Sequence, residues 1–172
     1  MKFVFTAVAS ALLLSATPAM AADGTGFYVG AGIGSFGLDF DLGEGDDFSG
    51  DDTSFKVLGG WNFNQFIGGE LEYIDGGSPE DFGVGIDVSG WNFSLKGTYP
   101  FTEQFNAFAK VGLIAWEVDA MGVSDDGNDF SWGIGGGYEF TDNFGARIEY
   151  QGFEIEDTDT ADLISASVIY KF

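Results

Sequence analysis

The sequence predicts an all-β fold, an eight-stranded antiparallel up-and-down transmembrane β-barrel. Three observations favour it: apolar and polar residues alternate along most of the chain, short turns alternate with longer acidic connections, and the charges share one face of the predicted strands. The C-terminal strand shows the alternation clearly. One of its faces carries Ile164, Ala166, Val168, Tyr170 and Phe172, and the other carries Ser165, Ser167 and Lys171.

The N-terminus is typical of a secretion signal. Lys2 supplies a positive charge, residues 3–14 are apolar, and Ala19-Met20-Ala21 forms a small-x-small cleavage site. This apolar stretch is shorter than the about 20 residues that a membrane-spanning helix needs. We therefore expect a signal peptide over 1–21 and a single β-barrel domain over 22–172.

Two kinds of connection separate the predicted strands. Three short turns, at 63–66, 101–105 and 140–144, place polar residues between two Phe, and four acidic connections near 42–52, 75–83, 119–129 and 156–161 are longer. Short periplasmic turns and longer external loops are typical of outer-membrane barrels. A ten-stranded barrel is the alternative. The expected strands are 26–40, 53–63, 66–74, 86–99, 105–118, 130–140, 144–155 and 162–172.

Alternation alone does not show which face points inward, but the charges do. A Lys or Arg that faces lipid at mid-membrane would cost about 2–4 kcal/mol. The polar face is nearly neutral, as a buried face requires, and its glycines leave the room that a narrow lumen needs. We therefore expect the apolar residues to face lipid. The charges expected inside are Lys56, Glu70, Glu72, Lys96, Lys110, Glu139, Arg147, Glu149 and Lys171.

The stretches 95–102, 109–113 and 135–150 resemble the membrane domain of the OmpA family and the small porin-family barrels related to it, such as the OmpX type. The resemblance implies an outer-membrane location and a charge cluster that plugs the lumen. Glu70, Lys96 and Arg147 match members of that cluster. The position of the second acid of that cluster is occupied by Gly137 in this sequence. Glu139, two residues later on the same face, is the expected substitute.

The interior cluster that we predict has a structural or gating role. It comprises Glu70, Glu72, Lys96, Lys110, Glu139, Arg147 and Glu149. The sequence lacks the peptidoglycan-binding domain of full-length OmpA proteins, so no anchoring of that kind is expected.

The C-terminal strand is similar to the signal by which outer-membrane barrels engage the barrel-assembly machinery, with Val168, Tyr170 and Phe172 as the expected contacts. The implied further partners are outer-membrane lipids and lipopolysaccharide, and we expect a monomer. A formal charge of −22 argues against nucleic acid. No cofactor is expected.

The chain contains no histidine, whereas the lipid A deacylases, palmitoyl transferases and omptin-type proteases among outer-membrane barrels use a catalytic one. Glu70 and Glu72 share a face, and paired carboxylates can perform acid–base chemistry. With Lys96, Lys110 and Arg147 on the same face, a structural ion-pair network is the favoured interpretation. We therefore expect no enzyme.

Acidic segments supply the oxygen ligands that calcium prefers. They lack the spacing of an EF-hand loop, so solvated loops are the simpler interpretation and no metal is assigned. The candidates for weak cation binding are Asp46, Asp47, Asp51, Asp52, Asp125, Asp126 and Asp129.

Two functions stay open at this point. One is a structural and surface-interaction protein with acidic external loops and a plugged lumen. The other is a narrow channel for ions or small solutes. The state of the lumen distinguishes them.

Overall fold

The computed structural model describes residues 25–41, 47–77, 80–81, 84–120, 123–154 and 160–172, so the predicted signal peptide lies outside the described residues. In this part of the chain no helix has the length and apolarity needed to cross a bilayer. The strands are β1 (Gly26–Asp41), β2 (Asp47–Asn62), β3 (Ile67–Asp75), β4 (Glu80–Asp81), β5 (Val84–Pro100), β6 (Phe105–Ala120), β7 (Val123–Glu139), β8 (Phe144–Glu154) and β9 (Thr160–Lys171).

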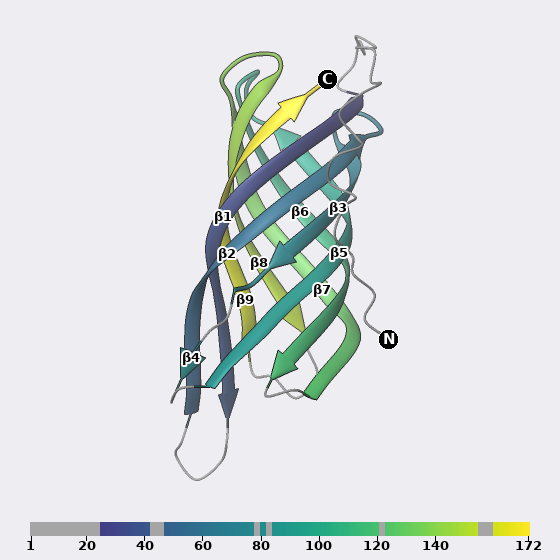
Figure 1. The fold of residues 1–172 in the computed structure, drawn as a ribbon. Helices are drawn as coiled ribbons and strands as arrows, with labels where there is room; N and C mark the ends of the chain where they lie inside the picture. The colour runs from purple at the N-terminus through teal and green to yellow at the C-terminus, as the bar shows by residue number, and fades with distance from the viewer. Residues whose placement is uncertain (1–24, 42–46, 78–79, 82–83, 121–122, 155–159) are drawn as a thin grey trace.

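Eight of these strands form one closed antiparallel barrel (Figure 1). The barrel closes where β1 pairs with β9, with Val29 opposite Tyr170, and β3 is joined to β5, with Glu72 opposite Asn92. The two-residue β4 pairs only with the start of β5 and is no part of the wall. The eight-stranded prediction is confirmed over the described residues, and the ten-stranded alternative is wrong.

The three short turns share one mechanism. The backbone N–H of Phe101 donates to the carbonyl of Phe105 at 2.9 Å, and Phe63 and Phe140 make the same bond to the residue four positions on. A polar side chain then accepts from the backbone inside each turn. Thr102 accepts from Phe105 at 2.9 Å, Thr141 from Phe144 at 3.0 Å, and Asn64 from Ile67 at 2.9 Å. The first turn is therefore one residue longer than predicted, and β3 begins at Ile67.

The opposite end of the barrel corrects the sequence prediction. The acidic segments expected as loops at 42–52 and 119–129 are largely strand, because β2 begins at Asp47 and β7 at Val123. Asp52 lies opposite Phe36, and Asp129 opposite Ile114. Antiparallel hydrogen bonds need no apolar side chains, so the pairing continues where the alternation that predicted the strands has ended.

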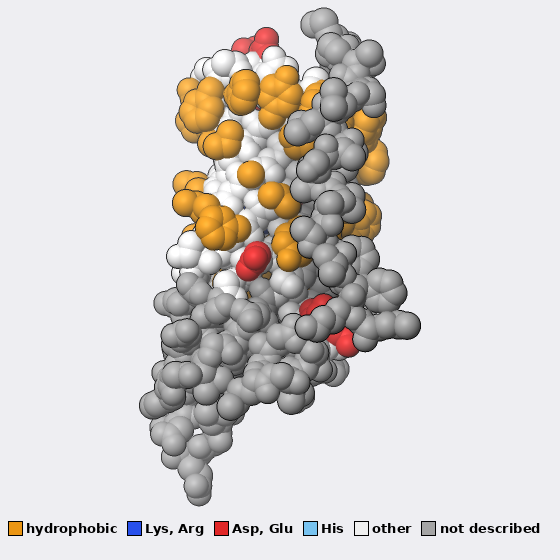
Figure 2. Space-filling model, viewed as in Figure 1, with side chains coloured by type: hydrophobic (Ala, Val, Ile, Leu, Met, Phe, Trp, Pro, Cys, Tyr) orange, Lys and Arg blue, Asp and Glu red, His pale blue; other side chains and the backbone are white. Residues whose placement is uncertain are grey.

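Side chains on the wall point as predicted, with the apolar ones outward and the charged ones into the lumen. Ile148 is 68% exposed whereas its neighbour Arg147 is 5% exposed. On the face in Figure 2 the hydrophobic side chains gather in two tiers, and no Lys or Arg of the described residues is visible. Because these apolar groups surround the barrel, this surface fits lipid. An aromatic belt lies at the end with the short turns, formed by Phe63, Phe66, Tyr99, Phe101, Phe105, Phe140, Phe144 and Tyr170.

Tight contact between β1 and β9 explains the glycines that face inward on β1. A Cβ built on Gly32 lies 2.5 Å from the carbonyl oxygen of Ala166 and 2.9 Å from the Cβ of Ser167. A carbonyl within a strand ladder cannot move aside without breaking its pairing. Glycine at this position therefore lets the two ends of the barrel meet.

We predict that Gly32→Val lowers the free energy of unfolding by about 1–3 kcal/mol, the usual cost of overpacking a filled interior. Urea unfolding in detergent micelles, with the mobility of unheated protein on gels as a check of folding, measures this. Gly97→Val is the matched control, since a Cβ there has no neighbouring heavy atom nearer than 4.0 Å. Equal stability of the two variants would contradict the packing argument.

Candidate functional site

Six charged side chains meet in the centre of the lumen. Three carboxylates and three basic groups make this central cluster formally neutral, and all six side chains are at most 4% exposed. They come from four strands, so the cluster connects opposite walls of the barrel. Its members are Lys56 on β2, Glu70 and Glu72 on β3, Lys110 on β6, and Arg147 and Glu149 on β8.

Arg147 forms the most specific contact of the central cluster. Its two terminal nitrogens donate to the two oxygens of Glu70 at 2.7 and 3.0 Å, which is bidentate geometry. One of these nitrogens also lies 3.1 Å from Glu149. The guanidinium thus links β8 to β3 across the lumen.

The two lysines bridge the carboxylates. The Lys110 ammonium lies 2.9 Å from Glu70 and from Glu72 and also pairs with Glu149. Lys56 pairs with Glu149 at 2.7 Å and with Glu72 at 3.3 Å. Each carboxylate therefore contacts at least two cations, as burial of so many charges requires.

Neutral side chains complete the hydrogen bonding on the side away from the short turns. The Gln151 amide donates to Glu72 at 2.8 Å and accepts from Lys56 at 2.9 Å. Asn92 donates to Glu72 at 2.9 Å and accepts from Ser131 at 2.7 Å. Our sequence analysis did not assign Gln151 to the site, although it lies two residues after Glu149 and so shares its face.

Lys96 lies between the central cluster and the end with the short turns. Its ammonium donates to the Tyr28 hydroxyl, which itself donates to Glu70 at 2.6 Å. Glu139 lies farther toward the turns and pairs with Lys171 at 2.6 Å. The structure thus places Glu139 at the mouth of the barrel and not beside Arg147, where the family resemblance suggested an acid.

A second feature of the lumen was missed by our sequence analysis. Beyond the central cluster, away from the short turns, the interior is filled by an apolar layer. Ile74 lies two residues after Glu72, and Phe153 two after Gln151, so both share the inward face. This outer apolar layer consists of Phe36, Ile74, Ile114, Phe153, Ala161 and Leu163, with Trp116 packed against it.

A metal ion at the centre of the lumen would compete with the basic side chains of the central cluster. Oxygens of Glu70, Glu72 and Glu149 lie within 4.8 Å of one another, close enough for one cation. Lys56, Lys110 and Arg147 already supply the positive charge there. A metal ion would have to displace at least one of these groups.

The structure describes only part of the predicted cation-binding residues. Asp46 lies outside the described residues, and of Asp47, Asp51, Asp52 and Asp125 only the strand is described. Asp129 accepts a hydrogen bond from the Trp116 indole at 2.5 Å, and Asp126 is exposed on the same strand.

The C-terminal residues lie on the outer face near the turns. Val168 is exposed there, and the Tyr170 ring contacts Phe144 and Phe172 with centroids 5.0 Å apart in each pair. Phe172 in turn contacts Phe27 at 5.5 Å. These rings join β9 to both of its neighbours.

Comparison with known proteins agrees with this geometry. The profile of the outer membrane protein beta-barrel domain matches residues 6–172. Outer membrane protein A of Yersinia pseudotuberculosis is 29% identical over 134 residues, which cover 66% of this chain and 38% of that protein. The chain thus matches well under half the length of this relative.

Solved structures with the same fold have low sequence identity to the chain. Neisserial surface protein A has a TM-score of 0.70 at 18% identity, covering 85% of this chain and 97% of that one. The N-terminal barrel of Pseudomonas aeruginosa OprF has a TM-score of 0.62 at 14% identity, covering 87% and 99%. Ail of Yersinia pestis has a TM-score of 0.58 at 14% identity, covering 86% and 99%. The chain belongs to the outer membrane protein β-barrel domain family, as an OmpA-like small barrel.

We predict that Arg147→Ala lowers the free energy of unfolding by about 3–5 kcal/mol, because it leaves Glu70 and Glu149 buried with an excess of negative charge. Equilibrium unfolding in lipid vesicles, followed by tryptophan fluorescence, measures the change. The control is Lys171→Ala, whose side chain is 38% exposed and whose removal should cost at most about 1 kcal/mol. Similar losses in both variants would argue against a special role of burial.

Proposed function

We propose that this outer-membrane barrel is a closed structural protein that presents acidic strand ends at the cell surface, and that it is neither a channel nor an enzyme. The observation that carries the proposal is the filling of the lumen at two successive levels. The central cluster occupies the middle, and the outer apolar layer lies next to it on the side away from the short turns.

Each level opposes ion flow for a different reason. In the central cluster the ion pairs take the space and the charges that a permeating ion would use. In the outer apolar layer Leu163 is fully buried, and Phe36 and Ile74 are each 3% exposed. An ion there would lose its hydration without gaining a polar partner. Rearrangement of the ion pairs alone would therefore leave the second barrier in place.

The acidic residues lie mostly on the other side of the membrane from the turns. Of the 28 Asp and Glu residues, 21 fall in segments 39–52, 75–87, 117–129 and 154–162, which contain no Lys or Arg. These segments adjoin the strand ends opposite the short turns, the external end in outer-membrane barrels. Such a surface attracts cationic partners and repels anionic ones.

Other surfaces of the barrel suit partners of other kinds. Outer-membrane lipids contact the apolar wall, and divalent ions can link the acidic ends to lipopolysaccharide phosphates. The exposed face of β9 with Val168 and Tyr170, together with Phe172 directly after the strand, is the contact for the barrel-assembly machinery. We also propose cleavage of a signal peptide over 1–21 and a monomeric barrel.

We predict that the folded wild-type barrel shows no steady open conductance in planar bilayers. Arg147→Ala alone stays closed because the outer apolar layer remains, and Phe153→Ala with Leu163→Ala stays closed because the central cluster remains. Only the three changes together should give reproducible openings. A steady conductance of the wild type would support the channel and overturn the proposed closed barrel.

Surface binding gives a second prediction, because the acidic ends favour cationic partners. Ail of Yersinia pestis was solved in complex with a heparin analogue, whereas this chain in nanodiscs should bind polylysine and not heparin, with binding lost as salt rises. Neutralising Asp51, Asp52, Asp125 and Asp126 to Asn should weaken polylysine binding at least tenfold, about 1.4 kcal/mol. Asp142→Asn at the opposite end is the control. Binding to heparin, or no effect of the four changes, would contradict this surface role.

A further inference from the structure

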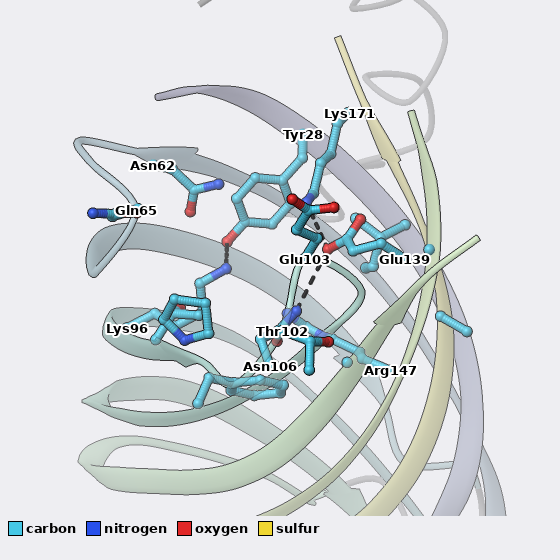
Figure 3. A pocket seen from close by; sticks show the side chains of 17 residues that line it. Tyr28, Asn62, Gln65, Lys96, Thr102, Glu103, Asn106, Glu139, Arg147 and Lys171 are labelled. Carbon is cyan, nitrogen blue, oxygen red and sulfur yellow. Dashed lines mark hydrogen bonds and ion pairs between the residues drawn. The ribbon is translucent and has the colours of Figure 1, made fainter. Parts of the chain in front are cut away.

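The mouth of the barrel between the short turns contains a pocket of about 200 Å³ that the central cluster closes from below (Figure 3). Lys96 reaches toward the Tyr28 hydroxyl on one side, near Asn62 and Gln65. Glu139 and Lys171 lie on the other side. The lining also includes Thr98, Thr102, Asn106 and Glu103.

Among the described charged side chains inside the lumen, pairing leaves Lys96 as an excess cation. The central cluster is neutral by itself, and Lys171 is matched by Glu139. The carboxylate that pairs with Lys96 is that of Glu70, at 3.6 Å, which is beyond hydrogen-bonding distance. Glu70 already bonds to Arg147 and Lys110.

The contacts of Lys96 compensate its charge only in part. Its side chain is 11% exposed, so little water reaches it. The ammonium donates to a neutral hydroxyl and lies 4.1 Å from the centre of the Tyr28 ring. The Glu70 carboxylate, 3.6 Å away, is shared with two other cations, so the burial of the Lys96 ammonium stays costly and a counter-ion beside it lowers that cost.

The pocket has groups suited to such a counter-ion. Thr102 accepts two backbone hydrogen bonds, from Gln104 and Phe105, and so keeps its own hydroxyl proton for a ligand. The amides of Asn62 and Gln65 add further donors. Arg147 also borders the pocket, from its floor.

The same lining limits the charge and size of the ligand. Inside the lumen only Lys96 is in excess over the carboxylates of the described residues. At the rim of the pocket the carboxylates of Glu139 and of the exposed Glu103 would repel a polyanion. The floor is closed by the ion pairs of Arg147 and by Phe108 and Ile169. From these constraints we infer that the pocket is a binding site for a small monovalent anion of the size of chloride, with the Lys96 ammonium as its main ligand.

This site is a blind one, because the ion pair between Arg147 and Glu70 closes the lumen beneath it. Anion binding thus compensates the charge of the Lys96 ammonium without ion transport. The negative charge of the chain as a whole, −22, would otherwise disfavour any anion, so occupancy depends on the local field of Lys96.

The test is the ³⁵Cl NMR line width of sodium chloride in the presence of the whole barrel, refolded from urea into zwitterionic micelles. Exchange of chloride with the site should broaden the line, and bromide should compete. Lys96→Met should abolish this broadening, whereas Lys96→Arg should retain it. The gel mobility of unheated protein shows that each variant is folded.

A second variant tests the inference even if Lys96→Met does not fold. Glu103→Gln, on an exposed turn, removes a repelling charge and should tighten chloride binding about three- to tenfold. Broadening that is absent in the wild type, that persists in folded Lys96→Met, or that does not increase in Glu103→Gln would overturn the anion site. Bilayer recordings test the closed lumen separately, so the two proposals can fail independently.

Discussion

The absence of water in the hydrocarbon core is the constraint on which the rest of this structure depends. Every backbone N–H and C=O within the membrane must be paired inside the protein, and a closed barrel achieves this with no free edge. Closure occurs where β1 pairs with β9 and β3 with β5. With eight strands, the lumen is only wide enough for side chains to fill it, so closure of the wall also determines what the interior must contain.

The residues inside the barrel follow from the orientation of the two faces of the wall, which is the reverse of that in a water-soluble barrel. Because the apolar residues surround the barrel, the polar ones meet inside, where an isolated charge is very unfavourable. The central cluster solves this by exact matching of charge number, with Glu70 between Arg147 and Lys110. Where the number is unequal, as at Lys96, the structure places the excess next to a pocket open to solvent. The position of a charged side chain along the lumen thus follows from whether its charge is matched.

The sequence was sufficient for the wall and for most of the central cluster. Alternation with a period of two placed Glu70, Glu72 and Glu149 on one face, and this needs no tertiary information. It was insufficient for Phe36, Ile74, Phe153 and Leu163, because an apolar residue in phase with the polar face has no distinctive local pattern. It also missed the strands of the acidic segments, because their backbone pairing is not accompanied by an alternation of apolar and polar residues.

The missed apolar layer changes the interpretation of the lumen more than any detail of the charges. Had the interior been polar throughout, a rearrangement of the partners of Arg147 would have been enough to open a water path. Phe153 follows Gln151 by two residues, so the inward face of β8 changes from polar to apolar within one step of the strand. A path for ions would then require motion of Phe153 and Leu163 as well as of the ion pairs. Two independent rearrangements are costlier than one, which favours a closed barrel.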